Sequence, residues 1–116
     1  MTTATSYRVI DRDALKKKID SNERFHLWNV LKKEYYNENK NIPGSKWIPV
    51  DALAGELPKL GAGKNDDIVV YCGSFTCPSS KQAAELLAGR GYTNVSAFEG
   101  GVADWEEGNL PFITIE

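Results

Sequence analysis

Two cysteines, Cys72 and Cys77, stand close together in a segment of small residues. A cysteine thiolate is a strong nucleophile, but an unperturbed thiol titrates near ~8.5 and is mostly protonated at neutral pH. Cys72 directly follows the apolar run 68–71, and a helix is expected after it. The N–H groups of a loop from strand to helix point toward its centre, and the helix dipole adds positive potential. We therefore expect a lowered pKa and a reactive thiol at Cys72; the alternative is a buried structural cysteine.

Cys77 is the second residue of this segment with chemistry to offer. In one interpretation it is a resolving thiol, which attacks a persulfide or sulfenate on Cys72 and closes an internal disulfide. In the other it is a small, half-buried residue beside the helix start. A disulfide requires Cα atoms within ~7 Å of each other, so the shape of the loop decides between the two. The chain has one histidine, His26, so a tetrahedral zinc site stays incomplete, and we expect no metal and no organic cofactor.

Hydroxyl side chains near Cys72 add hydrogen-bond donors to the segment: Ser74, Thr76, Ser79 and Ser80. With the loop N–H groups they suit an anion such as a persulfide, thiosulfate or phosphate. Phosphatases and arsenate reductases that use a cysteine nucleophile have a Cys-x5-Arg loop, whose arginine clamps the oxyanion. The residue six positions after Cys72 is Pro78, and the loop holds no arginine. Oxyanion chemistry of that class is therefore excluded.

Aromatic and histidine side chains leave further interpretations open. His26 invites a Cys–His pairing, but its apolar surroundings in the sequence favour a packed or edge histidine. Phe75, an aromatic among small loop residues, is an anchor, a shield over the sulfur or part of a partner surface. The three tryptophans are expected in the core, with Trp47 the one that could flank the site: Trp28, Trp47 and Trp105.

The elements that must position Cys72 alternate between strands and helices. Strands are predicted at 7–10, 25–31, 46–48, 68–71 and 94–98. Helices are predicted at 12–21 with Asp11 as cap, from Pro78 to Gly89 or Gly91, and after Glu99-Gly100-Gly101. Residues 32–40 suit a loose helix or loop, and residues 50–60 suit one or two short helical turns closed by Gly61 and Gly63. The order predicts an α/β fold with a central parallel sheet and helices on both faces, and Cys72 at a carboxyl strand end, where such sheets bind ligands.

Composition limits the function classes. The 116 residues suit one domain, with a core at about 7–112, and 41% of them are hydrophobic and 26% charged. The net charge of −2 argues against nucleic-acid binding. No apolar run reaches the ~18 residues of a membrane-spanning helix, and residues 1–10 lack a signal-peptide stretch. Two cysteines are too few for a disulfide scaffold, so we expect a reduced, cytoplasmic setting.

Five landmarks, in order, resemble the rhodanese-like (sulfurtransferase) domain family over residues 7–112: Ile42-Pro43-Gly44-Ser45, Ile68-Val69-Val70-Tyr71-Cys72, Gly91-Tyr92 with Asn94-Val95, Glu99-Gly100-Gly101 with Trp105, and Gly108-Asn109-Leu110-Pro111. The resemblance implies a catalytic cysteine at the start of the loop, by position Cys72. This cysteine would take sulfane sulfur from a small-molecule or protein donor, hold it as a persulfide and pass it to a thiol acceptor. The rest of the loop would hold the persulfide through its N–H groups: Gly73, Ser74, Phe75, Thr76 and Cys77.

The chain also departs from the family pattern. Asn29 and Leu31 stand where the family often has Asp and Arg, and Asn41 replaces the His before Ile-Pro-Gly. The spacing from Cys72 to Gly91-Tyr92 is about two residues longer than usual. The loop has no basic residue, and the nearest cations in sequence are Lys64 and Lys81. An anionic donor is normally helped by a cation, so we expect a persulfide donor to suit this loop better than thiosulfate.

Two function classes therefore remain open. The first is a sulfurtransferase that uses Cys72, which the intact cysteine and the small loop favour. The second is a noncatalytic rhodanese-like module that binds a partner or acts in thiol redox chemistry, which the missing loop cation keeps open.

Overall fold

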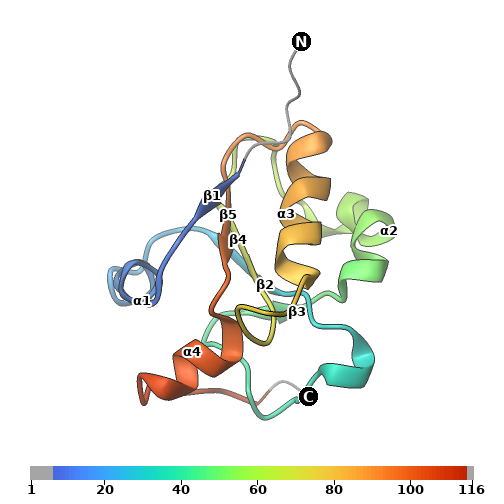
Figure 1. Ribbon diagram of the computed structural model, residues 1–116. Helices are drawn as coiled ribbons and strands as arrows, with labels where there is room; N and C mark the ends of the chain where they lie inside the picture. Colours follow the sequence, from blue (N-terminus) through green and yellow to red (C-terminus); the bar gives the residue numbers. More distant parts are fainter. Residues whose placement is uncertain (1–6, 115–116) are drawn as a thin grey trace.

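The computed structural model describes residues 7–114. Its centre is a sheet of five parallel strands in the order β1-β5-β4-β2-β3 (Figure 1). The strands are β1 (Arg8–Val9), β2 (His26–Asn29), β3 (Lys46–Trp47), β4 (Ile68–Tyr71) and β5 (Val95–Phe98). β4 lies in the middle, and its last residue leads directly into Cys72. The predicted α/β class and parallel sheet are confirmed.

Helices cover both faces of the sheet. They are α1 (Arg12–Asp20), α2 (Val50–Leu60), α3 (Ser79–Gly89) and α4 (Gly101–Glu107), with a short 3-10 helix at Lys33–Tyr35. α1 and α4 lie on one face, and α2 and α3 lie on the other (Figure 1). None of the helices within residues 7–114 is both long and apolar enough to cross a membrane.

The alternating side chains of β4 build the two halves of the core. Ile68 and Val70 pack in a cluster with residues of α2 and α3, whereas Val69 and Tyr71 pack with residues of α1 and α4. All four are fully buried, as expected for a parallel strand covered on both sides. The Tyr71 hydroxyl also accepts a hydrogen bond from the Ile42 N–H at 3.0 Å, which ties the Ile-Pro-Gly turn to β4.

Four strands are shorter than predicted by one to three residues (β1, β2, β3 and β5), and α1 ends one residue earlier than predicted. Two further helices, α2 and α3, also differ. α2 is one continuous helix of 11 residues, so the prediction of one or two short turns is wrong. Gly55 and Pro58 lower its helical propensity, but Leu53 and Leu57 fall on one buried face, and this packing stabilises the helix. α3 begins at Ser79, one residue later than predicted, with Pro78 as its cap.

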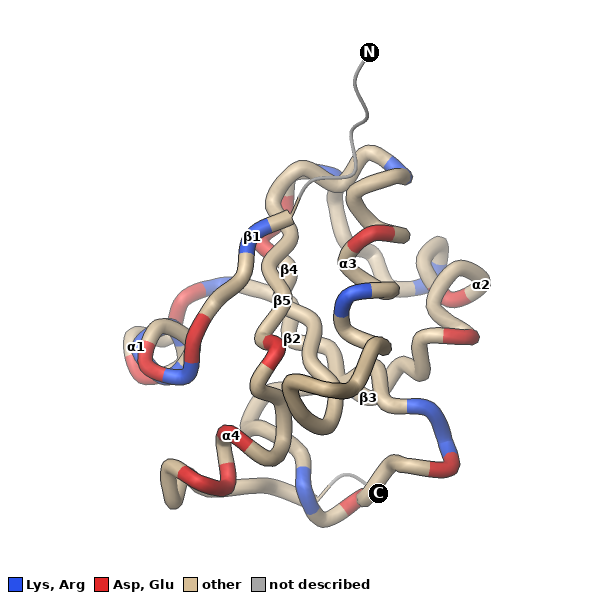
Figure 2. Tube along the Cα trace, viewed as in Figure 1, with Lys and Arg blue, Asp and Glu red and all other residues tan. Residues whose placement is uncertain are grey.

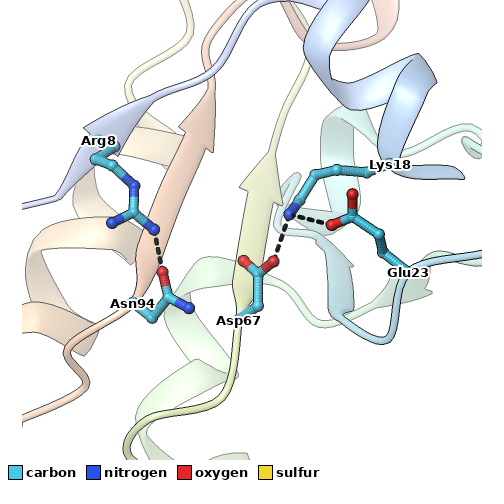
Figure 3. Close-up of polar contacts among 5 residues, drawn as sticks. All are labelled: Arg8, Lys18, Glu23, Asp67 and Asn94. Atoms are coloured by element: carbon cyan, nitrogen blue, oxygen red, sulfur yellow. Dashed lines mark hydrogen bonds and ion pairs between the residues drawn. The ribbon is translucent and has the colours of Figure 1, made fainter. Parts of the chain in front are cut away.

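The amino ends of the strands carry a polar network far from Cys72. Arg8 of β1 donates to the Asn94 side chain, and Lys18 of α1 contacts the carboxylates of Asp67 and Glu23 (Figure 3). Asn94 and Asp67 directly precede β5 and β4. These contacts fix α1 and β1 to the end of the sheet that is opposite the candidate site.

His26 belongs to this amino-terminal end of the sheet. The strand register pairs His26 with Ile68, the first residue of β4, whereas Cys72 follows the last residue. His26 Nε2 lies 3.0 Å from a carboxylate oxygen of Asp66. His26 is half-buried on an interior strand, with its ring centroid 5.6 Å from that of Trp28. Of the two expected alternatives, a packed or an edge histidine, the packed one is therefore confirmed, and the strand register places His26 away from Cys72.

Candidate functional site

The backbone of Cys72 is held between β4 and the start of α4. Val102 N–H donates to the Cys72 carbonyl at 2.9 Å, and Ala103 N–H donates to the Gly73 carbonyl at 2.8 Å. Gly101 takes φ +60°, and a Cβ there would lie 2.8 Å from the carbonyl carbon of Cys72. Only glycine permits this conformation and this approach, so the Glu-Gly-Gly landmark is explained as the clamp on Cys72.

The loop continues as a tight turn. Cys77 N–H donates to the Ser74 carbonyl at 3.0 Å, which closes the turn over Phe75 and Thr76. The hydroxyls of Ser74 and Thr76 pair with each other at 3.0 Å. Phe75 is 68% exposed and is not among the residues that line the adjacent pocket. Within residues 7–114, Phe75 therefore neither covers the Cys72 sulfur nor anchors the loop in the core.

The Cys72 thiol is fully buried behind this turn. Its Sγ donates to the Cys77 carbonyl at 3.4 Å. Burial raises the pKa of the Cys72 thiol, and its hydrogen bond to the Cys77 thiol raises it further. The predicted lowering of the Cys72 pKa is therefore wrong for the reduced protein, because desolvation outweighs the donors around the thiol.

The loop donors converge on Cys77 instead. Burial acts to raise the pKa of Cys77, but hydrogen bonds from the Cys72 thiol, the N–H groups of Gly73 and Ser79, and the Ser79 hydroxyl lower it. Cys77 is thus the more acidic of the two thiols. In the reduced protein the N–H groups of Gly73 and Ser79 therefore act on Cys77 and not on Cys72.

Ser80, on the first turn of α3, faces Cys72. Its side chain is 1% exposed, and its Oγ has no hydrogen-bond partner within residues 7–114. The Ser80 hydroxyl and N–H both act to lower the pKa of Cys72, which places them beside its sulfur. A buried hydroxyl without a partner is uncommon in folded proteins. A hydroxyl donor here would stabilise negative charge on Cys72 better than it would stabilise a neutral thiol.

A pocket of about 550 Å³ opens in front of the loop. Its lining comes from the loop, from α4 and from the segment between β2 and β3: Leu31, Lys32, Tyr35, Asn37, Lys40, Gly73, Ser74, Cys77, Pro78, Ser79, Val102, Ala103 and Glu106. Cys77 lines this pocket and Cys72 lies behind it. Of the predicted loop residues, Gly73, Ser74 and Cys77 meet the pocket, whereas Phe75 and Thr76 do not.

The cations of the site are Lys32 and Lys40, which the sequence reasoning missed. The segment between β2 and β3 carries several basic residues, and α4 carries acidic ones (Figure 2). Lys40 pairs with Glu106 of α4 at 2.9 Å, across the pocket. The nearest cations in sequence, Lys64 and Lys81, do not line it. The expectation of a site without a nearby cation is therefore wrong, because two lysines about 30 to 40 positions upstream reach it through the fold.

Two departures from the family pattern meet in a buried pair. Asn29 Nδ2 donates to Asn41 Oδ1 at 3.0 Å, and Leu31 N–H donates to Asn29 Oδ1 at 3.0 Å. Both asparagines are fully buried. The pair joins the end of β2 to the Ile-Pro-Gly turn without charge, where the family often has Asp and His.

A second contact holds the pocket wall. Trp47 Nε1 donates to the Leu31 carbonyl at 2.7 Å, and the Trp47 ring stacks on Tyr36 with centroids 3.9 Å apart. Trp28 and Trp105 are buried in the core, as predicted. Trp47 is half-buried and supports the segment that carries Lys32.

Comparison with known proteins identifies a matching family and solved structures with the same fold. The family described as "Rhodanese-like domain" matches residues 11–108. A Bacillus subtilis (strain 168) protein named "Putative sulfur carrier protein YrkF" is 31% identical over 102 residues. The match covers 88% of this chain and 52% of that protein, so the chain spans about half the length of this relative.

Solved structures agree. The rhodanese-like domain of the Alr3790 protein from Anabaena is 27% identical, with a TM-score of 0.79 over 95% of this chain and 81% of that one. A rhodanese with anions from E. coli is 31% identical, with a TM-score of 0.59 over 70% of this chain and 91% of that one. A human single-domain sulfurtransferase, TSTD1, shares the fold at 24% identity, with a TM-score of 0.71 over 88% and 97%. With the family matched from before α1 to the end of α4, the chain belongs to the rhodanese-like domain family.

Proposed function

We propose that this protein is a sulfurtransferase that carries sulfane sulfur as a persulfide on Cys72. The observation that carries the proposal is the unpartnered hydroxyl of Ser80, buried beside the Cys72 sulfur at the carboxyl end of β4. The Ser80 N–H also acts to lower the Cys72 pKa. Two donors aimed at a buried sulfur suit a thiolate or a persulfide, which are anions, better than they suit a neutral structural thiol.

The transfer begins with loss of the Cys72 proton to solvent. Cys72 Sγ then attacks the sulfane sulfur of a donor. A bond forms between Cys72 and the transferred sulfur, the donor's sulfur–sulfur bond breaks, and the donor leaves as a thiolate, or as sulfite when thiosulfate is used. An acceptor thiolate then attacks the outer sulfur, takes it and leaves the Cys72 thiolate.

The pocket is where donor and acceptor would enter. Gly73, Ser74 and Cys77 line its floor, and Lys32 and Lys40 line its wall. A cation beside the loop favours anionic donors, among them thiosulfate as well as low-molecular-weight persulfides. The rhodanese from E. coli that was solved with anions is 31% identical to this chain, and this supports an anionic donor.

The setting and partners belong to the same proposal. Two reduced thiols must be kept in the loop, which favours a reduced, cytoplasmic environment. The acceptor is a thiol on a small molecule or on a protein. The sulfur carrier name of the Bacillus relative supports a protein partner. Residues 7–112 would serve as one rhodanese-like domain.

Intact-mass measurement tests the proposal. The reduced chain and a Cys77→Ser variant are incubated with a low-molecular-weight persulfide, and separately with thiosulfate. A gain of one sulfur mass, absent in Cys72→Ser, is expected. If neither chain gains sulfur from either donor, Cys72 is no carrier, and the protein is a partner-binding module of the same fold.

A further inference from the structure

We propose that Cys77 is an internal acceptor for the Cys72 persulfide, so that the protein also reduces sulfane sulfur to sulfide. The inference rests on the proposed function, because it requires sulfur to reach Cys72 first. Its basis is a position that the transfer reaction does not require: a second thiol held against the first by the same turn. The Ser74–Cys77 turn brings the Cys77 carbonyl to 3.4 Å from Cys72 Sγ.

Proximity makes the internal reaction competitive with transfer to an outside thiol. The thiols of Cys72 and Cys77 lie within hydrogen-bonding reach of each other. A nucleophile fixed beside its target gains a large effective concentration over a free thiol. The segment from Cys72 to Cys77 has six residues, and all except Cys72 are exposed or half-buried. A small backbone shift that closes a disulfide therefore displaces no other core residue.

The chemical step balances without an outside oxidant. The Cys77 thiolate attacks Cys72 Sγ, a bond forms between the two cysteine sulfurs, and the bond from Cys72 to the outer sulfur breaks. The outer sulfur leaves as hydrosulfide and takes the bonding electron pair. The sulfane sulfur is thereby reduced to sulfide, while the two cysteines are oxidised to a disulfide.

The pocket supplies the return path. Cys77 lines it and Cys72 lies behind, so the disulfide would present Cys77 to an entering thiol. A small external dithiol that attacks Cys77 gives a mixed disulfide, and its second thiol then releases both cysteines in reduced form. The external dithiol is therefore the final reductant.

The test loads the full chain with a low-molecular-weight persulfide, removes the donor by rapid gel filtration and follows mass and free sulfide without reductant. In the natural chain, we expect release of one sulfide per chain. The mass should then fall to two hydrogens below that of the reduced protein. The rate should not depend on protein concentration, because the step is intramolecular. In Cys77→Ser, and in Cys77→Ala as a second variant, the gained sulfur should stay and no sulfide should appear.

The outcomes separate this inference from the proposed function. If the natural chain and both Cys77 variants hold the sulfur equally long, the internal step is overturned and the carrier role stands. If the Cys77 variants gain no sulfur while they remain folded, the carrier role itself fails. Sulfide release from the Cys77 variants at the rate of the natural chain would also overturn the internal step.

Discussion

Gly101 begins α4 directly against the carbonyl group of Cys72. Its φ is +60°, and a Cβ added at this position would lie only 2.8 Å from the Cys72 carbonyl carbon, which leaves no room for a side chain. The next two N–H groups of α4 bond the Cys72 and Gly73 carbonyls. The start of α4 thus fixes the backbone from which the Cys72 thiol projects.

Gly101→Ala should therefore destabilise the protein and displace the loop. The left-handed backbone conformation alone costs about 1–3 kcal/mol for a residue other than glycine, and the contact with Cys72 adds to it. Chemical denaturation should show this loss, and loading of Cys72 with sulfur should slow. Gly55→Ala in α2 is the matched control: a Cβ there meets nothing within 4 Å. That variant should gain stability, by up to about 1 kcal/mol. Equal stability of the two variants would show that α4 does not clamp the loop.

The two thiols should react with alkylating agents in a fixed order. The pKa of Cys77 is lowered, so its thiolate forms at lower pH than that of an ordinary thiol, whereas the raised pKa of Cys72 keeps that thiol protonated to higher pH. Peptide mapping after iodoacetamide treatment should find Cys77 modified first in the folded protein. In denaturant the difference should vanish. Alkylation of Cys72 before Cys77 in the folded chain would contradict a Cys77 pKa below that of Cys72.

Removing the Cys77 thiol tests the coupling between the two. The Cys72 pKa is raised by burial and, in addition, by its hydrogen bond to Cys77. Residual alkylation of Cys72 in Cys77→Ser should therefore begin at lower pH than in the natural chain. An unchanged or higher pH dependence would show that the two thiols titrate independently.

Lys32 should matter for anionic donors and not for uncharged ones. Its side chain lines the pocket, whereas the neighbouring Lys33 does not. A charge-assisted contact contributes about 1.5–3 kcal/mol, so Lys32→Gln should raise the KM for thiosulfate by about tenfold or more. Lys33→Gln, which makes the same change in net charge, should leave it within about twofold. An uncharged organic trisulfide should be used equally well by all three proteins. Equal effects of the two substitutions would assign the role to net charge and not to the pocket.

The sequence pattern was informative wherever local chemistry decides structure. The apolar run before Cys72, Asp11 as the α1 cap and the glycines at the start of α4 all lie where the sequence predicts. Strand burial, capping and turn formation depend on neighbours in sequence. The continuous α2 was missed because tertiary packing outweighed the weak propensities of Gly55 and Pro58.

The site was less predictable, because its details depend on contacts between distant segments. Lys32 and Lys40 line the pocket because the segment between β2 and β3 folds beside it. No local sequence motif predicts this arrangement. Asn29 and Asn41 each differ from the residue that the family often has, and the hydrogen bond between them shows that the two differences belong to one buried contact. The order of the thiol pKa values depends on which sulfur is buried, and residue spacing alone does not reveal burial.

Ser80→Ala should separate function from stability. Ser80 Oγ is buried without a hydrogen-bond partner within the described chain, and such a group is a net cost of about 1–3 kcal/mol to the folded state. Its removal should therefore leave the free energy of unfolding unchanged or raise it. The Cys72 pKa should rise further, because the hydroxyl acts to lower it, and sulfur loading of Cys72 should become slower.

The comparison with another buried serine makes this prediction decisive. Ser96 is 5% exposed on β5 and pairs in register with Val69, toward the amino end of β4 and away from Cys72. Ser96→Ala should leave the loading rate of Cys72 unchanged. If Ser80→Ala loads at the natural rate, the hydroxyl does not serve the sulfur anion. If Ser80→Ala loses stability, the hydroxyl has a structural partner, and its position beside Cys72 no longer supports the carrier role. If the Ser80 hydroxyl serves as a hydrogen-bond donor to the persulfide, Ser80→Ala should give a protein that is at least as stable as the natural chain and that loads sulfur more slowly.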